Sequence, residues 1–523
     1  MTITELQAGF CQKLQSLVQE LVQGAMGALD AWERGSLSAI QKIAQAAARA
    51  TQECVYEAWK EVLVAMSEAL GASCGKCGRQ RKRRWRHERP MKVGVVGQDV
   101  KVPNLYLECR HCKGAGLSVL KLLTGLRSGD ASEELKLLAG YSGAEHSYRQ
   151  ASQAMEAHHG QAIERMKIRR MALEIEKSAM EFAAESRSQA MERLEEEGSP
   201  TAEGPPILLL EADGGKVRTG ELQALEPDDP GYGKKTAKRE VARRKRPAQF
   251  REVLTMDVRE PGEVVASALD VMVPVLSEEG ERERRMLALA ARRGMTENTE
   301  MIGLGDMGSG LASAFSEAFE VINPSSRWYA DWKHTKDYVS EAKKALLSRT
   351  DLDAQQWAQE LTQAIWDRDE KRRDGLLEQV QPTAPHEVER LPDERKSSTT
   401  ERCPVHALTT YLNNNWQHMH FATLRERQLP IVSARAEAHV RDRTKSRFAG
   451  PGVWRIENLE PKATLRSLIA EGRWHEFRAF HLEKNRELFH QAFLDRLENA
   501  VASGRLQKER VSLLFPSYQA RSK

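Results

Sequence analysis

The stretch Ile207-Leu-Leu-Leu-Glu-Ala-Asp213-Gly-Gly decides how the central part of the chain folds. Its short, continuous apolar run is typical of a buried strand. We expect that strand to end at the acidic residues, and strand ends are where α/β folds expose functional groups. The glycines after Asp213 leave room for a ligand or metal ion to approach. An Asp-Gly pair after a strand is, however, more often a turn than a catalytic acid.

A second run, further along the chain, has the same form. Glu300-Met-Ile-Gly-Leu-Gly predicts a strand, Asp306 follows it, and a helix is expected to begin near Ser309. Phe250 to Val258 predicts a neighbouring strand. Two or three carboxylates that converge at strand ends can hold two Mg²⁺ ions about 3.5–4 Å apart, as phosphodiester chemistry requires. Composition and periodicity alone do not choose between such a site and two ordinary turns.

Four of the seven cysteines form two identical Cys-x-x-Cys pairs: Cys74, Cys77, Cys109 and Cys112. Each pair fits a tight knuckle that turns both sulfurs toward one ion, and Gly75 and Gly78 suit that turn. Four thiolates are the donor set of a tetrahedral structural Zn²⁺ site. The insert between the pairs alternates like strands, so the region resembles a zinc ribbon in outline. A chance pairing of thiols and a redox dithiol are the alternatives.

A basic cluster lies between the cysteine pairs. Seven of the eleven residues from Arg79 to Arg89 are Arg or Lys, and Trp85 stands among them. On a zinc-bound hairpin such a cluster makes a phosphate-binding surface, although it would also suit a solvated loop. The residues expected to bind DNA here are Arg79, Arg81, Lys82, Arg83, Arg84 and Arg86.

A second candidate DNA-binding segment follows in the helical region 119–200. Two short helical patterns precede His158-His159-Gly160, and a basic helix then begins at Gln161. A helix–turn–helix would place this last helix in the major groove, but helix–Gly–helix is equally common in ordinary bundles. Its basic residues are Arg165, Lys167, Arg169 and Arg170.

The overall composition limits the class of protein. The 523 residues are 40% hydrophobic and 29% charged, which is typical of a soluble globular chain with several domains. No apolar run approaches the roughly 18 residues of a membrane helix, and the N-terminal sequence lacks a secretory signal. We therefore expect a cytoplasmic protein without membrane contacts. The net charge of +4 averages over concentrated basic segments at 79–92 and 234–246.

From about residue 74 to 480, the order of motifs resembles a bacterial insertion-sequence transposase of the DDE type, with a two-Cys-pair ribbon ahead of a ribonuclease-H-like catalytic domain. The matching pieces are the two cysteine pairs, Glu211-Ala-Asp-Gly-Gly, Phe250-Arg-Glu-Val, Gly305-Asp-Met-Gly, Asp331-Trp-Lys-His, Tyr411-Leu-Asn-Asn-Asn with Met419-His-Phe, Leu429-Pro-Ile-Val-Ser-Ala-Arg-Ala-Glu-Ala, and Arg443-Thr-Lys with Gly452-Val-Trp. No piece is decisive alone, but eight in this order make a strong match.

The resemblance implies that Asp213, Asp306 and Glu437 are the catalytic acids and bind two Mg²⁺ ions. It also implies that Asp331 and His334 support the site without binding the metals. In a rival assignment Asp331 is the second acid; we disfavour it because Asp306 lies where the fourth strand of the fold should end. The chain departs from the family at Met307, which separates Asp306 from Gly308, and at Ser433-Ala-Arg-Ala-Glu437, where the family favours Ser-Gly-x-Val-Glu.

The expected fold class is therefore mixed α and α/β. The expected parts are a helical N-terminal arm (1–70), a zinc ribbon (71–118), a helical region with a candidate helix–turn–helix (119–200), a ribonuclease-H-like core in two parts (205–340 and 426–485), an all-helical insertion (341–425) and a C-terminal helical tail (486–523). The resemblance implies cleavage of double-stranded DNA at transposon ends and strand transfer into target DNA, by a homo-oligomer at the bacterial nucleoid. A catalytically inactive, repressor-like DNA-binding protein and a nuclease of the same fold are the alternatives.

Overall fold

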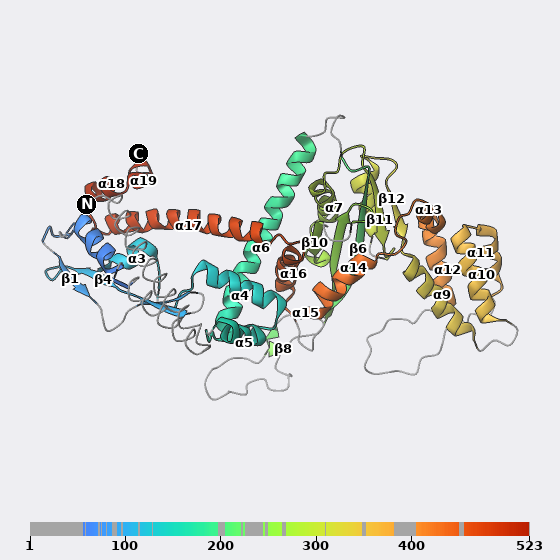
Figure 1. Cartoon of the computed structure of the whole chain (residues 1–523), viewed down its shortest axis with the longest axis horizontal. Helices are drawn as coiled ribbons and strands as arrows, with labels where there is room; N and C mark the ends of the chain where they lie inside the picture. Colours follow the sequence, from blue (N-terminus) through green and yellow to red (C-terminus); the bar gives the residue numbers. More distant parts are fainter. Residues whose placement is uncertain are drawn as a thin grey trace, which may run out of the picture. The chain divides into compact units, whose positions relative to one another are not determined.

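The central sheet of the computed structural model has five strands, all within one of the two compact units of the chain (Figure 1). The structure describes residues 56–57, 59–71, 74, 76–79, 81–85, 91–95, 98–112, 116–127, 129–159, 161–196, 204–220, 223–224, 244–245, 249–263, 268–308, 310–347, 352–380, 404–448 and 454–521. One unit contains the described residues up to Gly143, those of Tyr148–Ile175 and those from Arg478 onward. The other contains Ala144–Ser147 and Glu176–Phe477.

The first unit contains the predicted ribbon. Strands β1 (Lys82–Trp85), β4 (Leu105–Glu108) and β5 (Leu117–Ser118) form an antiparallel sheet. Strands β2 (Met91–Val95) and β3 (Gln98–Val102) form a separate antiparallel hairpin.

The ribbon shares its apolar core with helices that are distant in sequence. Leu63 comes from a helix N-terminal to the cysteines, Leu105 from β4 and Leu120 from α3 (Val119–Thr124). Leu497 of α17 (Trp474–Ala502) and Val511 of α18 (Lys508–Leu514) complete the same cluster. The tail predicted at 486–523 is thus helical, ends with α19 (Pro516–Arg521), and packs against the ribbon.

The region after the ribbon forms α4 (Glu133–Glu145), α5 (Tyr148–His159) and the long α6 (Arg165–Glu196). Leu135, Met155 and Ile168, one from each helix, lie together in a buried cluster. The described part of 119–200 thus consists mainly of helices, and its assignment as a separate DNA-binding region stays a prediction.

The five-stranded sheet consists of β6 (Ile207–Thr219), β9 (Gln249–Arg259), β10 (Ala268–Met272), β11 (Glu300–Gly305) and β12 (Arg327–Ala330). Their order across the sheet is β10-β9-β6-β11-β12. Strand β9 is antiparallel to both β10 and β6, whereas β11 is parallel to both β6 and β12. The predicted strands at 250–258 and 300–305 are confirmed within one residue at each end.

The prediction that the first strand ends at Asp213 is wrong. β6 continues to Thr219 because β9 pairs with it along its whole length, from Leu209 opposite Arg259 to Thr219 opposite Gln249. The apolar run ends early because β11 stops opposite Ala212, and beyond that point β6 has lost its parallel neighbour. The length of the apolar run therefore corresponds to the part of β6 that pairs with β11, not to the whole strand.

Helices cover both faces of the sheet. Leu210, Met256 and Trp328 pack on one face against α7 (Glu281–Arg292), α8 (Leu311–Phe315) and the π-helical η2 (Ser316–Glu320). The other face receives α13 (Phe421–Glu426), α14 (Ala434–His439), η5 (Val440–Lys445), α15 (Ser446–Phe448) and α16 (Leu459–Ala470). Since Leu208, Leu209 and Leu210 are all buried, the predicted burial of this strand on both faces is confirmed.

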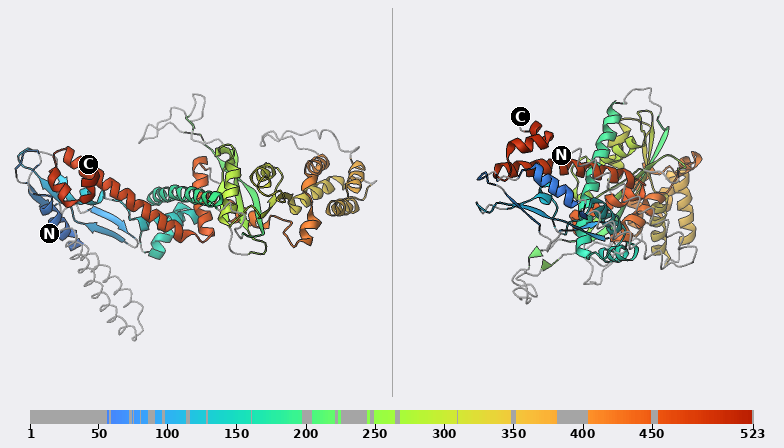
Figure 2. Two further views of the ribbon diagram at one scale, coloured as in Figure 1. Left: turned by 90° about the horizontal axis from the view of Figure 1, so that it is seen from above. Right: turned by 60° about the vertical axis from the view of Figure 1, so that its left-hand side comes forward.

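Helices α9 (Trp332–Leu346), α10 (Ala354–Asp367), α11 (Glu370–Glu378) and α12 (Pro404–Asn415) share one apolar core. Helix α9 begins before the predicted insertion (341–425), which as a domain stays a prediction. Figures 1 and 2 show these helices grouped beyond β12. Short elements complete the description: β7 (Gln223–Ala224), β8 (Arg244–Lys245), η1 (Pro274–Leu276), η4 (Trp416–His418) and η6 (Ile456–Asn458). Among the described residues, no helix is both long enough and apolar enough to span a bilayer.

A buried ion pair ties α16 to α6, and it yields a test of the fold. Lys462 contacts Glu176, and both side chains are fully buried. Glu176→Gln leaves the ammonium buried without its counter-charge, so we expect it to lower the free energy of unfolding by about 3–5 kcal/mol. The double variant Glu176→Leu/Lys462→Met should recover most of that loss. Urea unfolding measures both; a single variant as stable as the parent would contradict the expectation.

Candidate active site and metal centre

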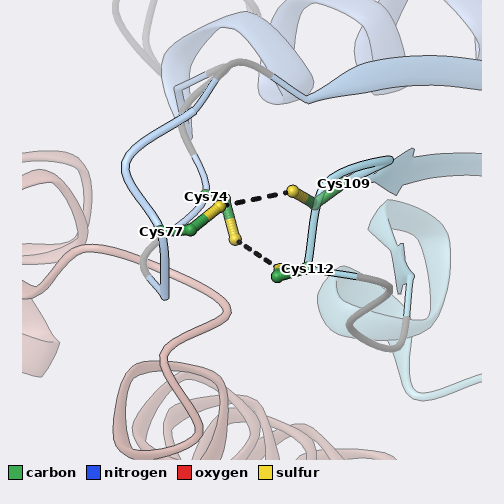
Figure 3. A group of neighbouring side chains, drawn as sticks. All are labelled: Cys74, Cys77, Cys109 and Cys112. Atoms are coloured by element: carbon green, nitrogen blue, oxygen red, sulfur yellow. Dashed lines mark hydrogen bonds between the residues drawn. The ribbon is translucent and has the colours of Figure 1, made fainter.

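The four paired cysteines meet at one point in the first unit (Figure 3). Cys74 and Cys77 lie in the turn before β1, and Cys109 and Cys112 lie in the turn after β4. The Sγ atoms of Cys74 and Cys112 are 3.6 Å apart, those of Cys77 and Cys109 are 3.5 Å apart, and all four lie within 4.8 Å of one another. No disulfide joins them, since a disulfide would need about 2.05 Å.

This geometry fits a tetrahedral metal site. A Zn–S bond of about 2.3 Å implies sulfur–sulfur separations of about 3.8 Å, close to those found. Gly78 makes the knuckle with φ = 69°, and its N–H donates to the carbonyl of Cys74. Burial raises the pKa of the Cys74 thiol, but backbone N–H donors of Lys76 and Cys77 outweigh it and lower that pKa to about 6. The backbone N–H of Arg79 lowers the pKa of Cys77, but burial and the neighbouring cysteines together raise it to about 11. The four cysteines could still hold Zn²⁺, because a bound ion would itself deprotonate them. Gly75 lies outside the described residues.

The basic residues of β1 extend from this centre. Lys82, Arg83 and Arg84 are exposed on the strand. Arg83 lies 3.1 Å from Glu68 and Arg84 lies 3.6 Å from Glu108. Such exposed pairs contribute little stability, so phosphate groups can compete for these cations.

The other predicted DNA-binding cations differ in exposure. Arg79 contacts His111 at 2.9 Å, Arg81 is half-buried, and Arg86 lies outside the described residues. On α6, Arg165 and Arg170 are exposed, whereas Lys167 and Arg169 are half-buried. The helix–turn–helix stays a prediction, because three consecutive helices are also what a plain bundle contains.

The register of the parallel strands brings two of the predicted acids to adjacent positions. Gly305 of β11 pairs with Ala212 of β6, so Asp306 and Asp213 are each the next residue after that pair. The Gly308 N–H donates to Oδ1 of Asp306 at 3.2 Å, which is the local turn that the Met307 insertion still permits. Asp213 is partly buried, and this burial raises the pKa of its carboxyl group.

The third predicted acid, Glu437, lies on the short helix α14, whose N-terminus is held by Asp331. Oδ2 of Asp331 accepts the Ser433 N–H at 2.5 Å and its hydroxyl at 2.6 Å. Oδ1 accepts the N–H groups of Lys333 and His334 at 2.6 and 3.1 Å, so the same carboxylate caps α9. Asp331 is fully buried and both its oxygens are engaged. This arrangement favours the supporting role over the rival role as second catalytic acid.

A second buried carboxylate, Glu211, holds the same helix from the sheet. Its Oε2 accepts the N–H groups of Arg435 at 2.9 Å and Ala436 at 3.3 Å, and Arg259 contacts its Oε1. Burial raises the pKa of Glu211, and the Arg259 guanidinium opposes that rise. The sequence indicates this role in one respect. Glu211 directly continues a buried apolar run, and a buried charge needs partners.

Glu437 is surrounded by side chains from α9. Lys333 Nζ lies 2.5 Å from Glu437 Oε2, and His334 Nε2 lies 4.0 Å from Oε1. Ligand atoms of Asp331, His334 and Glu437 lie within 4.8 Å of one another. Apart from the cysteines, this is the one group of three such residues within that distance in the described part of the chain. Asp213 is electrostatically coupled to both His334 and Glu437.

A fourth acid, Glu252 of β9, approaches the predicted acids from the other side. A Cβ added at Gly214 would overlap its carboxylate, so the missing side chain leaves room for Glu252. Burial raises the pKa of Glu252, Arg282 opposes the rise, and the charges of Asp306 and Asp213 add to it. The space that the glycine was expected to leave for a ligand is thus occupied by a carboxylate of the chain itself.

Comparisons with known proteins add little to this geometry. No protein-family model matches the sequence, and no curated protein sequence matches it significantly. Among solved structures, the chain is similar to the Drosophila P element transposase strand transfer complex, with a TM-score of 0.27 and 10% sequence identity. The match covers 66% of this chain and 93% of that chain. A similarity this low carries no argument about fold or function.

The metal centre is testable by metal content. We expect the purified full-length protein to contain one Zn²⁺ per chain, and Cys112→Ser to lose most of it because a structural site needs all four ligands. Elemental analysis by mass spectrometry after gel filtration gives the ratio. Cys403→Ser is the control, since Cys403 belongs to neither pair, and it should keep its zinc. A parent protein purified without chelators that contains no zinc would rule out the site.

The double anchor at Asp331 is testable by stability. Asparagine offers one acceptor oxygen in place of two, so Asp331→Asn should lower the free energy of unfolding by about 1.5–3 kcal/mol. Asp353→Asn is a matched control, because exposed Asp353 caps only α10, through the N–H groups of Gln355 and Gln356, and Asn caps helices as well as Asp. Equal stability of the two variants in urea titration would refute the anchor.

Proposed function

We propose that this chain is a DDE-type transposase that cleaves double-stranded DNA at transposon ends and joins the freed ends to target DNA. Asp213, Asp306 and Glu437 are its catalytic acids, and Asp331 and His334 position them. The observation that supports the proposal most directly is the β6–β11 register, which puts Asp213 and Asp306 at adjacent positions at one end of the sheet. The charge of Glu437 also acts on Asp213.

The strand order supports a ribonuclease-H-like domain. Numbered along the chain, the five strands lie in the order 3-2-1-4-5, with the second antiparallel to the rest. Asp306 then follows the fourth strand, as the family resemblance implies for the second acid. The helices of 332–415 then separate Asp306 from Glu437 in sequence, as an inserted helical domain does.

The donor chemistry of the site suits Mg²⁺. Carboxylate oxygens are hard ligands, and three of them come from three different elements, as a shared pair of ions requires. When bound, two Mg²⁺ ions about 3.5–4 Å apart activate the attacking hydroxyl and stabilise the leaving oxygen of an in-line displacement. Asp213, Asp306 and Glu437 would hold the ions.

The side chains around Glu437 have roles of their own. Lys333 contacts Glu437, and because its side chain is exposed it would also be able to contact a DNA phosphate. The same acids serve hydrolysis at the element end and attack by the resulting 3′-hydroxyl on target DNA, because both reactions are phosphoryl transfers. His334 Nε2, which is buried without a hydrogen-bond partner among the described residues, lies 4.0 Å from Glu437 Oε1 and would help to position that carboxylate.

The first unit supplies DNA recognition in this proposal. The zinc-bound turns would rigidify β1, whose exposed Lys82, Arg83 and Arg84 form a phosphate-binding row, and α6 would add Arg165 and Arg170. We propose that the active form is a homo-oligomer, because two transposon ends must be processed together.

The proposal is tested by cleavage of DNA that carries the sequences flanking the gene. With Mg²⁺ or Mn²⁺, Asp213→Asn and Glu437→Gln should each lower the cleavage rate on the order of a hundredfold or more, because each removes a charged group that stabilises the transition state. Glu279→Gln, an exposed acid before α7, is the matched control and should cleave like the parent.

Two outcomes would contradict it. Equal cleavage by the parent and Asp213→Asn would remove Asp213 from the mechanism. Specific binding of the flanking DNA with no cleavage under either metal would instead favour the repressor-like alternative.

A further inference from the structure

The β6–β9 hairpin extends past the predicted acids, and one of its faces is closed there. Val217 and Val253 are buried against Phe448 and Leu459. A Cβ added at Gly215 would lie 3.1 Å from Val440 and 3.0 Å from Thr444, so η5 packs directly on the backbone. This face of the hairpin is therefore part of the core.

The opposite face changes from closed to open along the same two strands. Near the start of β6 it is buried, with Leu210 and Met256 packed beneath α7. Further along, Lys216 pairs with Glu252, and Arg218 pairs with Phe250. Directly paired residues share a face. Lys216, Arg218 and Phe250 are all exposed, and 69% of the Phe250 side chain is accessible.

The two cations on this face are available to an outside partner. No ion pair or side-chain hydrogen bond joins Lys216 or Arg218 to another residue that the structure describes. Lys216 lies close enough to Glu252 to lower its pKa, and Glu252 in turn interacts with Asp213 and Asp306. Glu252 thus connects the open face with the acids by charge, although Asp213 itself alternates onto the closed face of β6.

The distances along the strand match a short length of nucleic acid. At about 3.3 Å per residue, Lys216 and Arg218 follow Asp213 by about 10 and 17 Å. Because β11 stops opposite Ala212, this part of β6 has no β11 beside it. Trp454 pairs with this edge only from Arg218 to Gly220, so a strand of DNA that passes the acids can cross the edge between Asp213 and Lys216 and reach the open face.

We propose that this face, defined by Lys216, Arg218 and Phe250, binds an unpaired segment of the DNA strand whose phosphodiester is cut. The inference rests on the proposed function. Cations beside an exposed aromatic ring are the pattern of single-strand binding, in which the ring stacks on a base and the cations contact phosphates. A duplex would engage the cations but would leave the ring without a base to stack on.

The test measures binding without divalent metal, so it does not depend on cleavage. The probe is a fluorescein-labelled, mixed-sequence single-stranded oligodeoxynucleotide, and its duplex is run in parallel, with the full-length protein. We expect Phe250→Ala to weaken single-strand binding about 5- to 100-fold, and Phe250→Trp to restore it. Lys216→Gln/Arg218→Gln should reduce the slope of log affinity against log salt by about 1.4.

Matched variants separate this face from general effects. Phe489→Ala removes another exposed phenylalanine, and Lys343→Gln/Lys344→Gln removes two cations of α9; both should bind like the parent. Since Phe250 is exposed, Phe250→Ala should melt at the parent's temperature. An oligonucleotide with 2-aminopurine should be quenched by the parent and not by Phe250→Ala.

The outcomes distinguish this inference from the proposed function. Unchanged single-strand binding by Phe250→Ala, or a loss confined to the duplex, would overturn the inference even if cleavage depends on Asp213. Conversely, Phe250-dependent binding together with cleavage that ignores Asp213→Asn would overturn the proposed catalytic acids and leave this binding face standing.

Discussion

The second unit depends on the capture of one helix N-terminus by two buried carboxylates. The first N–H groups of a helix have no partners within it, and they carry the positive end of the helix dipole. In α14 these groups, from Ser433, Arg435 and Ala436, are taken by Asp331 and Glu211. Without these acceptors a six-residue helix would have little reason to form. Glu437 owes its position to them.

The cost of burying these carboxylates is offset by a network that joins several elements. Glu211 contacts Arg259, and Asp257 lies 3.2 Å from Arg435 and 3.3 Å from His439. Asp331 also caps α9, so one side chain links the first helix of the insertion to the helix that carries Glu437. Removing one member of the network leaves its partners buried and unpaired, so the loss of a single side chain destabilises the whole network. Asp331 therefore connects α9 to the helix that carries Glu437, and the apolar core of α9–α12 also includes Ala330 of β12 and Phe421 of α13.

The sequence could predict whatever depends on local pattern. Periodicity and spacing predict the apolar run at 207–210, the strand before Asp306 and the convergence of the cysteine pairs.

The sequence could not predict that β6 continues through Lys216 and Arg218, because only pairing with β9 makes those polar residues a strand. The sequence also could not assign Glu211, because its partner Arg435 lies over two hundred residues away. It could not assign Glu252 either, because that side chain occupies the space left by Gly214 on the neighbouring strand. Helix α9 begins at Trp332 because Asp331 caps its first N–H groups, and the same carboxylate also holds Ser433, which is distant in the sequence. The assignment of catalytic roles stays a prediction.

The shared core of the ribbon and the C-terminal helices has a consequence for biosynthesis. Leu105 and Leu120 emerge from the ribosome well before their partners Leu497 and Val511 are synthesised. At about 5–20 residues per second, the chain between them takes on the order of 20–80 seconds to synthesise. For that interval the apolar core of the ribbon lacks the side chains of the C-terminal helices. The nascent chain therefore exposes part of that apolar surface to water until those helices are synthesised.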